Sequence, residues 1–436
     1  MKSSFHQKLI DFLNKENLYF WSVKSTFIKR AESYFIFGKP ESKRYGEFEK
    51  HTIFLWVINE DRDQKFVGSS TITISEKSND DEIKRMIDDA ITSASLVKNP
   101  FFEIPSQKFE YPDFSNADIS IKNNPVEVCE KISEKIIRSS SSLQNVKLST
   151  TELFVSYIEE KLTTSSKNTY KFEKTNLMLE GVFLAGRNLE TESFFTIDAV
   201  FIEDLNIEKI LNDQAKYAID CIDAKPLPTG KYNVIFGLEA LENFFGFFYT
   251  HSNAVSVYNK FSLLKLNEKI SKNIPEPSLN IRVEPLLKGG LYSAISDQFG
   301  IPLKPFAIIE NNILKNYVAQ LQYSQYLNIP YTGPATNYII EKGDISIDQL
   351  MSNENTVLLL RFSAFSPKDI TGDFSSEIRL GYITKNGKRI PVKGGSVSGN
   401  IRNLIHSMKL SNNIIKIGNY IGPDGIYLEG VDIAGE

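Results

Sequence analysis

Apolar residues in the first hundred positions change from helical spacing to strand spacing and back. Four apolar side chains share one face over residues 4–17, which predicts an opening amphipathic helix. Runs of β-branched and aromatic residues over 52–58 and 65–74 flank a polar turn, and this pattern predicts a β-hairpin. An acidic start and an apolar stripe over 83–94 then predict a helix. We therefore expect a sheet-plus-helix unit over residues 1–98.

A second unit is predicted over residues 99–223. Asn124 and Pro125 are typical of a helix start, because Asn caps the first turn and Pro suits the first helical position. Four strand-like runs follow between residues 145 and 202, and a helical pattern covers 207–222. This order predicts a central α/β unit.

A Pro- and Gly-rich joint at the start of residues 224–436 indicates the main domain boundary. A Phe-rich helix is expected over 238–249, followed by a β-rich region with hairpins at 310–312 and 386–387. The second hairpin carries Asn-Gly, which supplies the two positive φ angles of a type I′ turn. The predicted fold class is α+β: an N-terminal α/β region of two sheet-plus-helix units, then a predominantly antiparallel β domain.

Charge and composition narrow the function classes. The 436 residues carry a net charge of -4, whereas a domain that binds nucleic acid through bulk charge has a pI above about 9. An aromatic content of 12% excludes an acidic disordered chain. No run of about 18 apolar residues occurs, so we expect no membrane span, and the N-terminus lacks the apolar stretch of an export signal.

The cysteines and histidines limit the available chemistry. Cys129 and Cys221 have neither a zinc-binding nor a redox spacing, and two free thiols without an export signal predict a cytoplasmic protein. Cys129 lies on the apolar side of its helix, so we expect it to pack rather than react. With only four histidines, and no nucleotide-binding, nucleophile-elbow or HExxH motif, the chain lacks the common catalytic signatures.

Several short motifs of the C-terminal half resemble, in order and spacing, those of the TldD/TldE family, whose TldE branch is also called PmbA. The segments that carry the resemblance are Pro228–Tyr232, Gly289–Ser293 with Asp297, Gly300 and Pro302, Ile309–Tyr317, Thr371–Ser375, Ser398–Ile401 and the tail Gly430–Gly435. They cover almost all of residues 225–436, whereas the N-terminal half fits in layout more than in motif. The family has been described as modulators of DNA gyrase and as metallopeptidases.

The resemblance implies that the Phe-rich helix carries the positions of a metal-binding motif without most of its ligands; we call these positions the frame. The catalytic branch carries HExxxH there, with two histidine ligands, a glutamate base and a later cysteine. In this chain Gly246 and Phe247 occupy the first-ligand and base positions, and only His251 is present. No cysteine follows Cys221. The resemblance is therefore to the TldE branch, with no catalytic residues, metal or cofactor in this chain and zinc expected only in a TldD-like partner.

His251 also has a plain structural interpretation. It ends an apolar stripe at a helix C-terminus, where a partly cationic ring is favoured. We expect a structural or capping histidine rather than a ligand.

Two loops are candidates for a peptide-binding cleft, in which an extended peptide could add as a strand. Their candidate residues are Thr371, Gly372, Asp373, Phe374, Ser375, Gly399 and Asn400. The alternative is that these residues only form turns with special backbone angles.

The sequence thus predicts a TldE/PmbA-like subunit of a cytoplasmic metallopeptidase complex that processes unfolded peptides. Its partner would be a TldD-like chain, or a second copy of itself in a homodimer. One alternative is a peptidase acting alone, with His251 and carboxylates as unusual ligands. Another is a regulator of DNA gyrase, although the near-neutral charge disfavours direct DNA contact.

Overall fold

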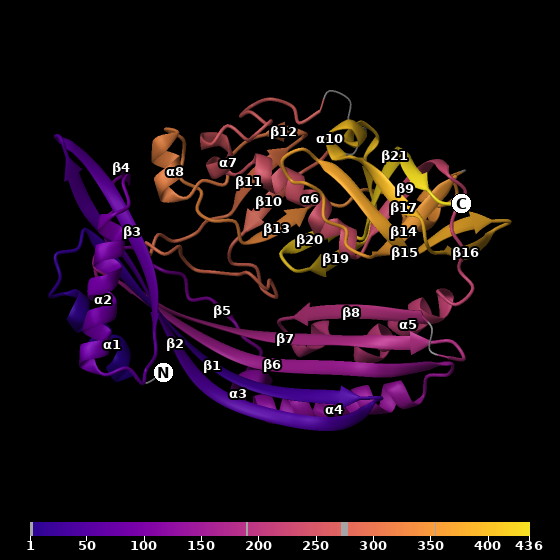
Figure 1. Cartoon of the computed structure of the whole chain (residues 1–436), viewed down its shortest axis with the longest axis horizontal. Coiled ribbons are helices and arrows are strands. Elements are labelled where there is room, and N and C mark those ends of the chain that lie inside the picture. The colour runs from indigo at the N-terminus through magenta and orange to yellow at the C-terminus, as the bar shows by residue number, and fades with distance from the viewer. Residues whose placement is uncertain (1–2, 189–190, 272–277, 354) are drawn as a thin grey trace.

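The N-terminal half forms one long, curved, eight-stranded sheet in the computed structural model, which describes residues 3–188, 191–271, 278–353 and 355–436 (Figure 1). Its strands run in the order β4-β3-β2-β1-β6-β7-β5, with β8 paired to β7. The strands are β1 (Phe20–Ile36), β2 (Lys39–Asp61), β3 (Gln64–Ile74), β4 (Asn99–Pro100), β5 (Ser115–Asn116), β6 (Val146–Thr164), β7 (Thr169–Ala185) and β8 (Thr191–Ala199). The predicted hairpin is β2–β3.

Helices cover one face of this sheet. They are α1 (Ser3–Leu13), α2 (Asp80–Ser95), α3 (Ile119–Asn123), α4 (Pro125–Ser141) and α5 (Ile207–Asp220). Along β1, Val23 and Phe35 are buried on the helix face, as the period-2 alternation of a strand requires. Asn79 and Glu82 form a capping box at the start of α2. The helices predicted at the N-terminus, after residue 79, after Asn124 and over 207–222 are confirmed.

The prediction of four strands between residues 145 and 202 is wrong, because three long strands occupy this region among the described residues. The charged stretch 159–161 lies inside β6. Glu160 is nearly buried and forms ion pairs with Lys24 at 2.7 Å and Lys174 at 3.2 Å, so its charge is neutralised within the sheet. Because β1 pairs with β6 over fifteen positions, the first two predicted units share one sheet; the domain boundaries themselves stay a prediction.

The C-terminal half is β-rich and confirms the α+β class. Its strands are β9 (Gly230–Gly237), β10 (Ile281–Glu284), β11 (Phe306–Glu310), β12 (Ile313–Leu314), β13 (Asn337–Ile340), β14 (Thr356–Phe362), β15 (Asp373–Lys385), β16 (Lys388–Val392), β17 (Ser396–Asn400), β18 (Lys409–Leu410), β19 (Ile414–Ile417), β20 (Tyr420–Pro423) and β21 (Gly425–Ala434). Its helices are α6 (Glu239–His251), α7 (Ala254–Tyr258), α8 (Leu321–Tyr326), α9 (Ile347–Leu350) and α10 (Ile401–Leu404).

Two sheets make up this half. One has the order β12-β11-β10-β13-β20-β19. In the other, β14, β9, β21, β17 and β15 pair in a closed ring, because β14 also pairs with β15. Five strands closed into a ring in this way form a small barrel. Both predicted hairpin turns are confirmed: Asn311 and Asn312 have φ angles of 51° and 62°, and Asn386 and Gly387 have 51° and 71°.

The sheet face without helices is turned toward the C-terminal half (Figure 1). At one end, Phe20 and Trp56 pack against Phe299, with ring centroids 5.9 and 4.7 Å apart. At the other end, Tyr382 donates a hydrogen bond of 2.6 Å to Asp220 at the end of α5. The two halves are therefore held together at both ends of the long sheet.

A third attachment lies between these ends. The amide of Asn116, on β5, donates to the carbonyl of Gly290 at 2.8 Å and accepts from the N–H of Gly289 at 2.9 Å. Asn116 is 1% exposed, so both bonds are shielded from water. A Cβ on Gly290 would lie 2.6 Å from the Asn337 amide, which explains why glycine is required there. No described helix is long and apolar enough to cross a membrane.

Candidate functional site

The Phe-rich helix α6 is buried on nearly all sides, which accounts for its composition. Phe244, Phe245 and Phe248 are fully buried and Phe247 is 2% exposed. The helix packs against β9 and β14 within the largest apolar core of the molecule. A helix that is apolar all round is the type that a protein interior accommodates.

His251 lies at the last position of α6, and both of its ring nitrogens are engaged within the chain. Nδ1 accepts a hydrogen bond of 3.1 Å from the N–H of Leu263, and Nε2 donates to the carbonyl of Ile370 at 3.0 Å. The side chain is fully buried, and burial lowers its pKa, so the ring is neutral at pH 7. A metal could bind this ring only by breaking one of the two bonds.

The other two positions of the frame offer no donor atoms. Gly246 has no side chain, and a Cβ there would lie 2.8 Å from Oδ1 of Asp369. The ring of Phe247 packs against His251, with centroids 4.4 Å apart, and lies 3.3 Å from where a Cβ on Gly372 would be. The segment that contains Asp369 and Gly372 therefore closes directly over the frame.

The predicted loop residues come together beside this frame. Asp373 accepts hydrogen bonds of 2.7 Å from the hydroxyl of Thr371 and from the amide of Asn400. These bonds lower the pKa of the Asp373 carboxyl. Asn400 also accepts from the N–H of Asn403, at the start of α10. The polar groups of the loops thus satisfy one another, as turn residues do.

The side chains of the remaining candidate residues on β15 alternate between buried and exposed positions. Phe374 is buried, whereas Ser375 is exposed. A Cβ on Gly399 would lie 2.7 Å from the ring of Phe374, so the two strands approach closely at this point. The pairing of β15 with β17 brings these residues together; their role as a cleft rim stays a prediction.

The donor set does not fit a zinc ion. Within the described ranges, no three His, Cys, Asp or Glu side chains lie close enough together to hold a metal ion. Both cysteines are buried free thiols, and burial raises the pKa of each. Cys129 contacts Ser33 at 3.3 Å, as expected for a packed rather than a reactive thiol.

Sequence reasoning missed a buried polar network around two of the four histidines. The hydroxyl of Ser25 lies 2.7 Å from Nδ1 of His6 and 2.6 Å from Nδ1 of His51. Nε2 of His51 lies 3.4 Å from the Glu49 carboxylate. Although serine, histidine and glutamate occur together, the two rings and the hydroxyl have no exposed surface, so no substrate could reach them. The network fixes α1 to the sheet.

Comparisons with known proteins agree with this architecture. Residues 229–435 match the model of the PmbA/TldA metallopeptidase C-terminal domain. A metalloprotease PmbA homolog from Buchnera aphidicola subsp. Baizongia pistaciae is 28% identical over 261 residues, which are 58% of this chain and 57% of that protein. A zinc metalloprotease TldD homolog from Saccharolobus solfataricus is 25% identical over 51% of this chain and 53% of that protein. These alignments span about half the length of each relative.

Solved structures match over essentially the whole chain. A proposed modulator of DNA gyrase from Thermotoga maritima superposes with a TM-score of 0.82 at 20% identity, covering 100% of both chains. TldE from Thermococcus kodakarensis superposes with a TM-score of 0.81 at 16% identity, covering 99% of each chain. Residues 229–435 thus match the PmbA/TldA metallopeptidase C-terminal domain, and the chain as a whole has the fold of the TldD/PmbA family.

Proposed function

We propose that this chain is a TldE/PmbA-like, non-catalytic subunit of a peptidase complex in which a TldD-like chain supplies the metal and the base. The proposal rests on the three residues that occupy the frame on α6. His251 uses both ring nitrogens within the chain, and Gly246 and Phe247 offer neither a ligand nor a base. The likeness in fold to TldE from Thermococcus kodakarensis supports the same branch.

In this proposal the chain contributes walls and peptide contacts rather than chemistry. Thr371, Asp373 and Ser375 are exposed beside the closed frame, so they are available to a peptide or to a partner surface. The polar side chains of Thr371 and Asp373 are already hydrogen-bonded to each other. Any recognition here would therefore depend on shape and main-chain contacts, with little selectivity for peptide sequence.

The test is a peptidase assay on unfolded peptides with the chain alone, a TldD-like partner alone, and both together. We expect no turnover by this chain alone, and turnover by the mixture that a chelator abolishes. As a matched control, a partner whose catalytic glutamate is replaced by glutamine should assemble with this chain but not cleave. Chelator-sensitive turnover by this chain alone would favour the stand-alone peptidase instead.

A gyrase assay addresses the remaining alternative. DNA supercoiling by gyrase should not change when the chain is added, because a net charge of -4 provides no bulk attraction to DNA. A dose-dependent change in supercoiling would count against the peptidase role.

A further inference from the structure

Two adjacent cavities lie between the N-terminal sheet and the C-terminal half, beside the first turn of α6, whose later turns carry the closed frame. Their volumes are about 420 and 550 Å³, within the range of small-molecule sites. Both are lined by Thr196 of β8 and by Glu239, Arg361 and Ile417 of the C-terminal half. Arg361 and Glu239 therefore stand at the boundary between the two cavities.

Strand β8 supplies one wall of the larger cavity. Its side chains alternate: Ser193 and Phe195 are buried, whereas Glu192, Phe194 and Thr196 are exposed. The cavity is lined by Glu192, Ser193, Phe194 and Thr196. Phe194 is 54% exposed, which is unusual for a large aromatic residue on an ordered strand. An apolar surface is thus available inside the cavity.

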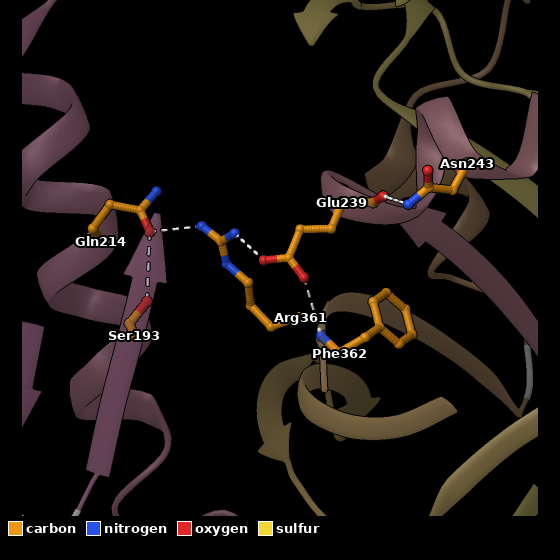
Figure 2. Close-up of polar contacts among 6 residues, drawn as sticks. All are labelled: Ser193, Gln214, Glu239, Asn243, Arg361 and Phe362. Atoms are coloured by element: carbon orange, nitrogen blue, oxygen red, sulfur yellow. Dashed lines mark hydrogen bonds and ion pairs between the residues drawn. The ribbon is translucent and has the colours of Figure 1, made fainter. Parts of the chain in front are cut away.

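Arg361 extends from the end of β14 across the gap toward the N-terminal half (Figure 2). It forms an ion pair with Glu239 and donates a hydrogen bond of 2.7 Å to Oε1 of Gln214, on α5. Glu239 also accepts from the N–H of Phe362 at 3.3 Å, so its carboxylate is shared between two donors. The Arg361 side chain is 13% exposed, and its Nε–H is buried without an acceptor. One of its N–H donors is therefore unsatisfied, although its charge is paired with Glu239.

Two further cations line the larger cavity. Arg379 is 47% exposed and has only a peripheral ion pair, at 3.3 Å to Glu377. Lys393 forms no ion pair with any residue in the described part of the chain. Arg361 is paired with Glu239 and Arg379 with Glu377, so Lys393 is the one cation of this lining that forms no ion pair among the described residues.

We propose that the larger cavity binds the terminal carboxylate of a peptide whose last residue is apolar. The ammonium of Lys393, which no described carboxylate pairs, suits a monoanion, whereas a phosphate group would bring a second negative charge close to Glu192 and Glu239. Lys393 and Arg379 provide charge-assisted hydrogen bonds to the carboxylate. Arg361 adds to the positive potential from the boundary between the two cavities. Phe194 and Ile417 accommodate the apolar side chain, and the smaller cavity takes the preceding residues.

This site goes beyond the proposed function and requires neither a metal nor a partner chain. It lies where both halves of the molecule contribute, because β8 and Gln214 belong to the N-terminal half and the cations to the C-terminal half. A bound peptide would therefore also strengthen the contact between the halves.

The test is calorimetric titration of the purified chain with an N-acetylated tripeptide that ends in leucine, as the free acid and as the C-terminal amide. We expect saturable binding of the acid and at least tenfold weaker binding of the amide. Lys393→Gln and Arg379→Gln should each weaken the acid about three- to tenfold and leave the amide unchanged. Lys388→Gln, an exposed lysine on the neighbouring strand β16, is the matched control and should change neither.

Three further arms decide the ligand class. Phe194→Ala should weaken a peptide ending in leucine more than one ending in glycine. Acetate and free leucine should bind at least tenfold more weakly than the tripeptide; equal affinity of acetate would show a simple anion site and overturn the peptide assignment. Equal binding of acid and amide, no effect of the Lys393 and Arg379 variants, or no saturable binding at millimolar peptide would each overturn the proposal. None of these outcomes depends on the peptidase assay, so the two proposals fail separately.

Discussion

Replacing His251 with alanine tests the structural role of the one histidine left in the frame. The substitution leaves the N–H of Leu263 and the carbonyl of Ile370 without their partners, at a site where the ring is fully buried. Each buried group left unsatisfied costs about 1–3 kcal/mol. The lost ring contact with Phe247 adds to this. Because Leu263 and Ile370 are 46% and 48% exposed, water can replace part of the lost bonding, and we expect the free energy of unfolding to fall by about 1–3 kcal/mol.

The pH dependence of this loss has a definite sign. Burial lowers the pKa of His251 below its usual value of 6.5, so the unfolded chain binds more protons than the folded chain just below that pH. The stability that the neutral ring contributes is present above pH 6.5 and is lost as the pH falls through the lowered pKa. The difference in stability between the wild type and His251→Ala should therefore shrink on acidification.

Urea unfolding at pH 7.5 and pH 5.5, followed by fluorescence, measures both effects. His251→Asn is the matched control, because its side-chain oxygen can accept the Leu263 N–H and should restore part of the lost stability. Partner-dependent peptidase activity of the folded variants should stay close to that of the wild type. If His251→Ala were as stable as the wild type but removed bound zinc or activity, the structural role argued here would be refuted.

Three further outcomes follow from the structure. Burial, Lys161 and His51 lower the pKa of His6 to about 4. The stability that the neutral ring contributes is therefore present above pH 6.5 and is lost between pH 6.5 and 4. Unfolding measured across this range should show that the free energy of unfolding falls by ~3 kcal/mol, and His6→Gln should diminish this fall. Asn116→Ala orphans two buried backbone groups at about 1–3 kcal/mol each, and limited proteolysis should detect loosened contact between the halves. In light scattering at micromolar concentration, the chain should be an oligomer, alone or with a TldD-like partner, through a C-terminal interface of upward of about 2,000 Å²; a monodisperse monomer in both samples would contradict this.

Local sequence signals predicted much of the fold because their physics is local. The Asn79 cap, the Asn124-Pro125 helix start and the Asn386-Gly387 turn each depend on a few neighbouring residues, and each is found in the structure. The long sheet was not predicted. The pairing of β1 with β6 joins residues more than 110 positions apart, and the charge of Glu160 is neutralised by lysines from two other strands. Such distant compensation has no signature in the local pattern.

In the candidate site, too, local features could be predicted from the sequence and long-range contacts could not. The family resemblance assigned Gly246, Phe247 and His251 to one frame, and the i, i+4 spacing of Phe247 and His251 brings their rings together. That Ile370 and Leu263 occupy both nitrogens of His251 depends on segments 119 and 12 residues away, and only the structure places them. The cavities beside Arg361 depend on contacts between the two halves, and an isolated arginine in a strand gives no indication of them.

The zinc content of the pure chain is the most direct test of the central claim, that this chain lacks a catalytic metal site. The chain should be equilibrated with buffered zinc, freed of loosely bound ions and measured by elemental analysis, with a TldD-like chain treated in parallel. We predict zinc far below one ion per chain for this protein and about one for the TldD-like chain. One tightly held zinc ion per chain in this protein would contradict the account.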